Sequence, residues 1–256
     1  MAGAVEKRLE GQPRAGRVLP AFALVGWRWV SRNPVATIVP ILLPFMFLYF
    51  LWRISDPRYF PLEVVGAMLF TTQNIGRWCL SDSAYWRIEQ RLQDLFVASP
   101  MGKVRYLFGI AFSNLIPAAP ALAILAVILA WVTPVSLFGW LMLLAAILVI
   151  WVTFSAIGLA VSSRLVSPRE VWPVGNLIFT TLGIISPLYY PITILPPVWQ
   201  GVARFLPATY AALLVQDALG LRSAVPGEMA LDAVLLLVSA VVGIGLALRL
   251  YRWRER

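Results

Sequence analysis

The stretch LFGWLMLLAAILVIWVTFSAIGLAV, residues 137–161, runs for 25 positions without a charged side chain. A helix needs about 20 mostly apolar residues to cross the ~30 Å hydrocarbon core of a bilayer, because unpaired backbone groups cannot be left in hydrocarbon. The stretch is therefore predicted to be a transmembrane helix. Five further stretches meet the same criterion, and the six together cover residues 34–52, 62–80, 106–132, 137–161, 172–188 and 230–250.

The composition of the whole chain agrees with this reading. Apolar residues make up 60% of the 256 positions and charged residues 13%, whereas soluble domains have roughly 45 to 50% and 25%. We therefore predict an all-α integral membrane protein of six transmembrane helices, forming one domain over residues 1–256. Residues 1–33 are expected to be a cytoplasmic tail and an interfacial helix, residues 34–250 the membrane domain, and residues 251–256 a second cytoplasmic tail.

The fifth predicted span, residues 172–188, is interrupted more than the others. Pro173 and Pro187 lie near its ends, and Gly175 and Gly183 lie inside it. Prolines and glycines are tolerated in membrane helices where neighbouring groups satisfy the freed backbone. The stretch is therefore retained as a span.

Basic residues are distributed unevenly between the two sides of the predicted bundle. With a cytoplasmic N-terminus, 17 of the 21 Lys and Arg residues lie inside, and only Arg53, Arg58, Arg204 and Arg222 lie outside. This bias follows the positive-inside rule and, with an even number of spans, predicts a multi-pass protein of the cell (plasma) membrane with both termini in the cytoplasm. Because the basic residues are spread between apolar blocks, and do not form one stripe, no nucleic-acid partner is expected.

The N-terminal region does not have the pattern of a cleaved signal peptide. Its first 18 residues are polar and basic, and no small-residue cleavage site follows the first long apolar block. Within residues 19–32, Phe22, Val25 and Trp29 alternate with arginines. This pattern is typical of an amphipathic helix on the membrane surface, and a poorly ordered basic tail is the alternative.

Residue usage also limits the chemistry that the chain can perform. Histidine is absent, which removes the commonest general base, the His-activated nucleophiles and the imidazole metal ligands. The single cysteine, Cys79, lies in an apolar segment and is expected to serve in packing. No acid pair, metal cluster or nucleophile dyad stands at useful spacing, so we expect neither a catalytic residue nor a metal site.

The cytoplasmic link SDSAYWRIEQRLQDLFVASPMGKVRY, residues 81–106, carries more information than the spans. Tyr85, Ile88, Leu92 and Leu95 recur at helical spacing on one face, and a proline and a glycine follow. The pattern predicts a short amphipathic helix of the kind that docks into a groove of a soluble partner. A helix that rests on the lipid headgroups is the alternative.

The external link, residues 186–228, is also distinctive. Its prolines divide it into pieces too short to span, yet its Ile, Leu, Val and Phe residues are too apolar for a solvated loop. Two short helices that dip into the outer leaflet, with aromatic side chains at headgroup level, fit both facts; an external cap packed on the spans is the alternative. The candidate gate residues of this re-entrant segment are Pro187, Tyr190, Pro191, Trp199 and Pro207.

These two links, in this order between six spans, resemble those of the permease subunits of type-2 ABC (ATP-binding cassette) exporters. In that family an acidic coupling segment follows the second span and ends in a small residue and a proline, and a proline-rich re-entrant segment precedes the last span. The resemblance covers essentially the whole chain, which departs from the pattern in having no glycine ahead of Asp94. The matching residues are Glu89, Leu92, Leu95, Ser99 and Pro100 in the first segment, and Pro187, Pro191, Leu195, Pro196, Gln200, Pro207 and Tyr210 in the second.

The resemblance implies a transport subunit, not an enzyme. It implies a separate cytoplasmic ATPase in two copies, which binds ATP and Mg, and a second permease chain, identical or different. The sequence itself has no G-x-x-x-x-G-K-[ST] phosphate loop, so no cofactor is expected in this chain. The implied substrates are drugs, lipids or lipid-linked glycans. Membrane lipid is a further expected partner, because it surrounds the chain. The residues expected to couple to the ATPase are Tyr85, Ile88, Glu89, Leu92, Asp94 and Leu95.

Polar residues inside the spans are candidates for lining the transport path. Such groups are costly against lipid and normally face the bundle or a cavity. Hydrogen bonding between helices explains them equally well. The candidates are Gln73, Asn74, Arg77, Asn176 and Thr180.

An ion-coupled secondary transporter is the main alternative function, and a membrane-embedded enzyme is the next. Secondary transporters usually carry an acid or a histidine at mid-membrane. In this chain the acids near the spans lie at the predicted span ends, at Glu63, Asp82, Glu170, Glu228 and Asp232.

Overall fold

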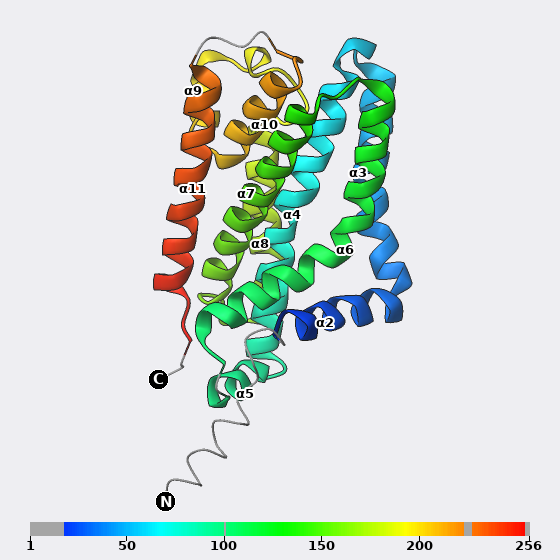
Figure 1. Ribbon diagram of the computed structural model, residues 1–256. Coiled ribbons are helices and arrows are strands. Elements are labelled where there is room, and N and C mark those ends of the chain that lie inside the picture. The colour runs from blue at the N-terminus through cyan, green and yellow to red at the C-terminus, as the bar shows by residue number, and fades with distance from the viewer. Residues whose placement is uncertain (1–17, 100, 223–226, 254–256) are drawn as a thin grey trace, which may run out of the picture.

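The computed structural model describes residues 18–99, 101–222 and 227–253, and this part of the chain is helical without a strand. Long helices run up and down beside one another, and the described chain begins and ends at the same end of the bundle (Figure 1). The prediction of an all-α fold is confirmed.

Six long helices coincide with the six predicted stretches. By length and composition, α6, α7 and α11 are the helices of the described chain suited to crossing a membrane, and α3 contributes a shorter apolar helix, Ile41–Ile54. The six-span count therefore stays a prediction. The six helices are α3 (Pro34–Ile54), α4 (Phe60–Ile88), α6 (Lys103–Val132), α7 (Leu137–Ser162), α8 (Pro168–Ile185) and α11 (Glu228–Leu250).

Shorter elements cover the two ends of the bundle. At the end that holds residue 253, α2 (Val18–Arg32) lies across the bundle and α5 (Leu92–Ala98) lies below it (Figure 1). The opposite end is built from short pieces, as the prolines of the external link predicted. These are η2 (Pro57–Tyr59), η3 (Ile192–Ile194), α9 (Pro197–Ala203) and α10 (Pro207–Ala218).

Helix α4 is the centre of the bundle and packs against α3, α6, α7, α8 and α10. Its contact with α7 is made backbone to backbone at two glycines: a Cβ on Gly158 would lie 1.9 Å from the Gly76 carbonyl oxygen. A Cβ on Gly76 would likewise lie 2.3 Å from the Phe154 oxygen. Only glycine permits an approach this close, so these two positions set the distance between the two helices.

The fifth predicted span begins and ends earlier than expected. Helix α8 starts at Pro168, not at residue 172, because Ser167 accepts a hydrogen bond from the Arg169 amide and proline fits the first helical position. It ends at Ile185, one residue before the extended Ser186 and two before Pro187. The stretch is a helix as predicted, displaced by about one turn.

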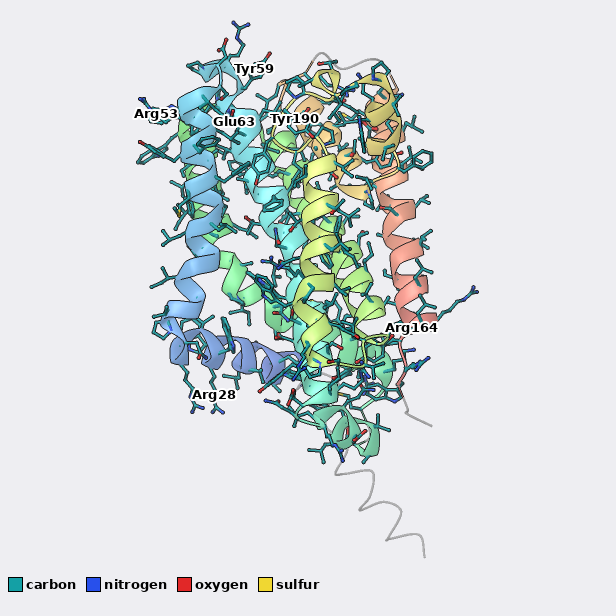
Figure 2. All side chains as sticks on the ribbon, turned by 180° about the vertical axis from the view of Figure 1, so that it is seen from behind. Arg28, Arg53, Tyr59, Glu63, Arg164 and Tyr190 are labelled. Atoms are coloured by element: carbon teal, nitrogen blue, oxygen red, sulfur yellow. The ribbon has the colours of Figure 1, made fainter. Side chains whose placement is uncertain are left out.

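Helix α2 confirms the helix predicted near the N-terminus. Phe22 is buried against α6, where a Cβ on Gly109 would lie 2.4 Å from its ring, and Gly26 packs equally closely on the Ser113 carbonyl. Arg28 points away from the bundle (Figure 2). Trp29 is 44% exposed, so the apolar face is only partly covered, and its position on the membrane surface stays a prediction.

We expect Gly158→Ala to destabilise the protein, because its Cβ would overlap the Gly76 carbonyl and force α4 and α7 apart. Overpacking of this kind costs about 1–3 kcal/mol or more. The measurement is the thermal unfolding midpoint of the purified chain in detergent. Gly245→Ala on α11 is the matched control, since its Cβ meets nothing within 4 Å. An equal midpoint for both variants would contradict the packing argument.

Candidate functional site

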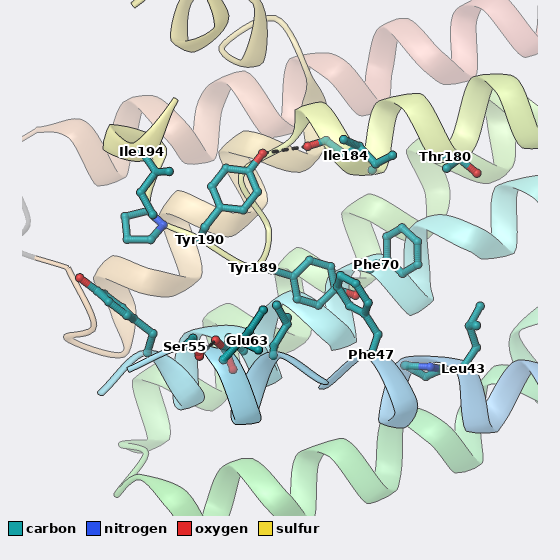
Figure 3. Close-up of a pocket in the computed structure, with 16 residues that line it drawn as sticks. Leu43, Phe47, Ser55, Glu63, Phe70, Thr180, Ile184, Tyr189, Tyr190 and Ile194 are labelled. Carbon is teal, nitrogen blue, oxygen red and sulfur yellow. Dashed lines mark hydrogen bonds between the residues drawn. The ribbon is translucent and has the colours of Figure 1, made fainter. Parts of the chain in front are cut away.

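An apolar cavity of about 580 Å³ lies between α3, α4, α8 and the chain that follows α8. Figure 3 shows that its wall includes aromatic rings from three of these segments, Phe47, Phe70 and Tyr189, which lie close together. The ring of Tyr189 packs edge-on against Phe47 at 4.8 Å and tilted against Phe70 at 5.9 Å. The volume is within the ~300–1,000 Å³ of pockets that hold small ligands.

A buried acid stands in the wall of this cavity. Glu63, in the first turn of α4, is 1% exposed, and its Oε1 accepts a short hydrogen bond from the Ser55 hydroxyl. Its Oε2 and the Tyr189 hydroxyl have no hydrogen-bond partner among the described residues. The sequence argument used Glu63 only as a span-end acid, and its burial is a tertiary property that no local pattern revealed.

The structure places two of the five candidate gate residues in the cavity wall and three outside it. Tyr190 and Pro191 line the cavity together with Ile194, and the Tyr190 hydroxyl donates to the Ile184 carbonyl at 2.8 Å (Figure 3). Burial raises the pKa of the Tyr190 phenol, so it stays protonated and remains a donor. The other three candidates, Pro187, Trp199 and Pro207, are not in the cavity wall.

Two structures were considered for the external segment: a pair of short helices in the outer leaflet and a cap packed on the spans. The structure has features of both. Helix α10 packs on α4, α7 and α11, and eight of its 12 residues are buried. In contrast, α9 and the residue after its C-cap expose Val198, Trp199 and Phe205, the last to 87%. Thus α10 is a packed cap, whereas α9 presents an apolar surface, and its insertion in the outer leaflet stays a prediction.

Four of the five candidate path residues of α4 and α8 form hydrogen bonds within or between these two helices. Arg77 donates to the Asn176 side-chain oxygen at 2.8 Å, and the Gln73 amide donates to the Phe179 carbonyl at 3.0 Å. Asn74 donates to the Phe70 carbonyl within its own helix at 2.9 Å. These bonds account for the polar groups as contacts between and within helices. Thr180 alone of the five candidates lines the apolar cavity, and a path-lining role stays a prediction for all of them.

The single amphipathic helix predicted from Tyr85, Ile88, Leu92 and Leu95 is not continuous, and this part of the sequence analysis was wrong. Helix α4 continues to Ile88, the chain turns at residues 89–91, and α5 starts at Leu92. The turn places Arg91 in the left-handed region at φ 51°. This conformation favours glycine, and the chain has an arginine there instead.

The break separates the predicted coupling residues into two groups that remain close in sequence. Tyr85, Ile88 and Glu89 belong to the end of α4, and Leu92, Asp94 and Leu95 to α5. Tyr85 is 51% and Leu95 67% exposed, Glu89 and Asp94 are also exposed, and Ile88 and Leu92 are half-buried. The group thus keeps an accessible apolar and acidic surface at the end of the bundle.

A hydrogen-bonded network holds α5 against the rest of the bundle. The buried Gln93 side chain donates to the carbonyls of Arg252 and Trp253 at 2.9 and 3.2 Å and accepts from the Tyr251 hydroxyl at 3.0 Å. That hydroxyl is also 3.0 Å from Ser83 of α4. Burial raises the pKa of the Tyr251 phenol, so it keeps its proton. One amide thus joins α5, α4 and the chain after α11.

The sequence matches the family described as ABC-2 type transporter over residues 23–219. The chain belongs to that family. The match begins within α2 and extends through α10, so it includes the residues of the apolar cavity, of α5 and of the external segment. The comparison with curated proteins yields no match.

Membership in the ABC-2 family confirms the resemblance seen in the sequence and makes the chain a membrane-spanning transport component of an ABC transporter. It favours the ATP-driven class over the ion-coupled and enzymatic alternatives. Among the described residues, no group of three or more Cys, Asp or Glu side chains is placed to hold a metal ion.

We expect Gln93→Ala to loosen α5 while the opposite end of the bundle is unaffected. The change leaves two carbonyls and the Tyr251 hydroxyl without this partner, and losing such buried bonds costs about 1–3 kcal/mol. Hydrogen exchange of the amides of residues 92–98 should then speed up by about tenfold or more. Gln90→Ala, the same truncation at an exposed position, is the control. Unchanged protection of residues 92–98 would show that Gln93 does not hold α5.

Proposed function

We propose that the chain is the membrane-spanning subunit of an ATP-driven exporter and couples to a separate cytoplasmic ATPase. The observation that carries this proposal is the course of α4. This single helix of 29 residues, about 43 Å long, has Glu63 of the apolar cavity in its first turn and Tyr85 of the coupling surface in its last. Movement imposed at one end is therefore carried to the other by a packed, rigid element.

The proposed direction and substrate class rest on the cavity and the charge bias. The cavity is lined almost entirely by apolar and aromatic side chains, which suits a hydrophobic or amphipathic substrate such as a drug, a lipid or a lipid-linked glycan. It lies at the end that the positive-inside rule places outside. Arg28 and Arg164 lie at one end of the bundle and Arg53 at the other (Figure 2), in agreement with that assignment.

In this proposal six helices cross the cell membrane, and a second permease chain, identical or different, completes the path. Three of the six, α3, α4 and α8, are less apolar or shorter than typical spans. Helix α4 tolerates this because its polar residues face other helices and not lipid. ATP and Mg bind in the two ATPase subunits, since the sequence lacks a phosphate loop.

We expect Leu95→Asp to release the ATPase without unfolding the permease. Leu95 is 67% exposed on α5 and has no packing role to lose, but a charge there would block an apolar docking contact. Detergent co-purification from native membranes, with ATPase assays on the reconstituted complex, measures the effect. Glu89→Ala should weaken coupling more than assembly.

Val166→Asp is the matched control, because Val166 is 82% exposed in the link between α7 and α8, at the same end. It should retain the ATPase. If Leu95→Asp also keeps a full complement of ATPase and normal ATP-driven transport, α5 is not the coupling element and is a membrane-surface helix instead.

Topology gives a separate test, on a Cys79→Ala background that leaves no native thiol. A membrane-impermeant maleimide applied to intact cells should label Arg58→Cys, since Arg58 lies on the exposed turn after α3. Gln90→Cys should react only after permeabilisation. Labelling of residue 90 in intact cells would show that the orientation is the reverse of the predicted one. It would also contradict the assignment of the coupling surface.

A further inference from the structure

A second cavity, of about 430 Å³, lies at the opposite end of the bundle from the first. It is enclosed by α2, α3, α4 and α6, next to the end of α4 that carries the coupling surface. It differs from the outer cavity in chemistry, because polar side chains share the lining with aromatic ones. Its polar lining residues are Thr37, Ser81, Asp82, Gln90, Ser113 and Asn114.

Four electron-rich rings stand around this space. Trp78 and Tyr85 are on one face of α4, seven residues apart, and Trp86 follows one residue later; Trp29 approaches from α2. Trp29 and Tyr85 are half exposed and form the open side. Trp86 is fixed from behind by stacking on Phe22 at 6.3 Å. Tryptophan faces attract cations more strongly than other aromatic faces do.

One carboxylate lies among these rings. Asp82 stands four residues after Trp78, on the same face of α4, and its Oδ2 accepts a hydrogen bond of 2.9 Å from the buried Asn114 amide. No Lys or Arg of the described chain forms an ion pair with Asp82, and none lines the cavity. Arg77, nearby on α4, is bonded to Asn176 instead. Among the described residues, the cavity therefore offers negative potential without a Lys or Arg in its wall.

We propose that this inner cavity binds a monovalent organic cation, either a quaternary ammonium or a protonated amine that carries an apolar body. Aromatic faces with a nearby carboxylate form the arrangement that recognises such ions. A hard metal cation would instead need several oxygen ligands, and the cavity supplies one carboxylate. A zwitterionic lipid headgroup fits less well, because its phosphate would meet no basic residue in the wall.

This site is additional to the proposed export function, since it lies apart from the outer cavity and its occupancy needs neither ATP nor a partner chain. Binding can be measured on the full chain alone in a nonionic detergent. Its outcome is thus independent of whether α5 docks an ATPase.

The probe is tritiated benzyltrimethylammonium, and equilibrium dialysis measures its binding to the protein. Neopentylbenzene, which has carbon in place of the charged nitrogen, tests the role of charge by displacement. We expect saturable binding that the neutral compound does not displace. Asp82→Asn, which keeps the shape of the side chain, should weaken binding by about tenfold or more. Glu170→Gln, at an exposed acid in the first turn of α8, should leave it unchanged.

Two further arms keep the proposal testable if Asp82→Asn misfolds. Trp29→Leu, at a half-exposed wall position, should weaken binding several-fold, with Trp29→Phe intermediate. Soluble dihexanoylphosphatidylcholine should displace the probe poorly. Binding that is charge-independent, or unchanged in Trp29→Leu, overturns the proposal. Displacement by the phospholipid at lower concentration than by unlabelled benzyltrimethylammonium also overturns it and identifies a lipid headgroup as the occupant.

Discussion

The close approach of α4 and α7 at Gly76 and Gly158 is the constraint on which the rest of the bundle depends. With no side chain between the two backbones, α7 covers one side of α4, and α3, α6, α8 and α10 cover the others. A helix enclosed in this way does not need a lipid-facing surface. It can therefore carry Gln73 and Arg77 in its middle, where each bonds to α8.

The enclosure of α4 also explains why a strongly apolar chain concentrates its polar chemistry on one helix. Polar side chains that bond from helix to helix are tolerated at low free-energy cost only where neither water nor lipid contacts them. Seventeen residues of α4 are buried, more than in any other helix of the described chain. At its two ends the enclosure is incomplete, and each end opens into a cavity that holds one acid, Glu63 or Asp82.

Much of this fold could be predicted from the sequence, because long apolar stretches bounded by prolines and polar residues leave few alternatives. The predicted range 137–161 differs from α7 by one residue, and 34–52 differs from α3 by two. The break at Arg91 could not be predicted, since no glycine or proline marks it and a periodic apolar pattern continues across it. Arg91 adopts its unusual conformation because Gln93 and the bonds to the C-terminal chain fix α5 in place.

The candidate sites were predictable only where they depended on local pattern. The predicted coupling residues came from helical spacing and from the family resemblance, and Tyr85, Glu89, Asp94 and Leu95 are exposed at one end of the bundle. Their coupling role stays a prediction. The acids of the two cavities were not found, because what distinguishes them is contact with Ser55 across the η2 turn and with Asn114, 32 positions away. Such contacts cannot be inferred from the spacing of residues or from the composition of the sequence.

The arrangement of the two cavities has a mechanical consequence. Glu63 and Asp82 are separated by 19 residues of one helix, about 28 Å along its axis. The outer cavity is completed by α3 and α8, and the inner one by α2, α3 and α6, so α3 and α4 both supply wall residues to the two cavities. A displacement of α8 alone would alter only the outer cavity. A rotation of α4 would alter both at once, and its end at Tyr85 lies at the surface where a cytoplasmic partner could impose it. Of the two helices that line both cavities, α4 is therefore the one through which a partner at Tyr85 could act on both.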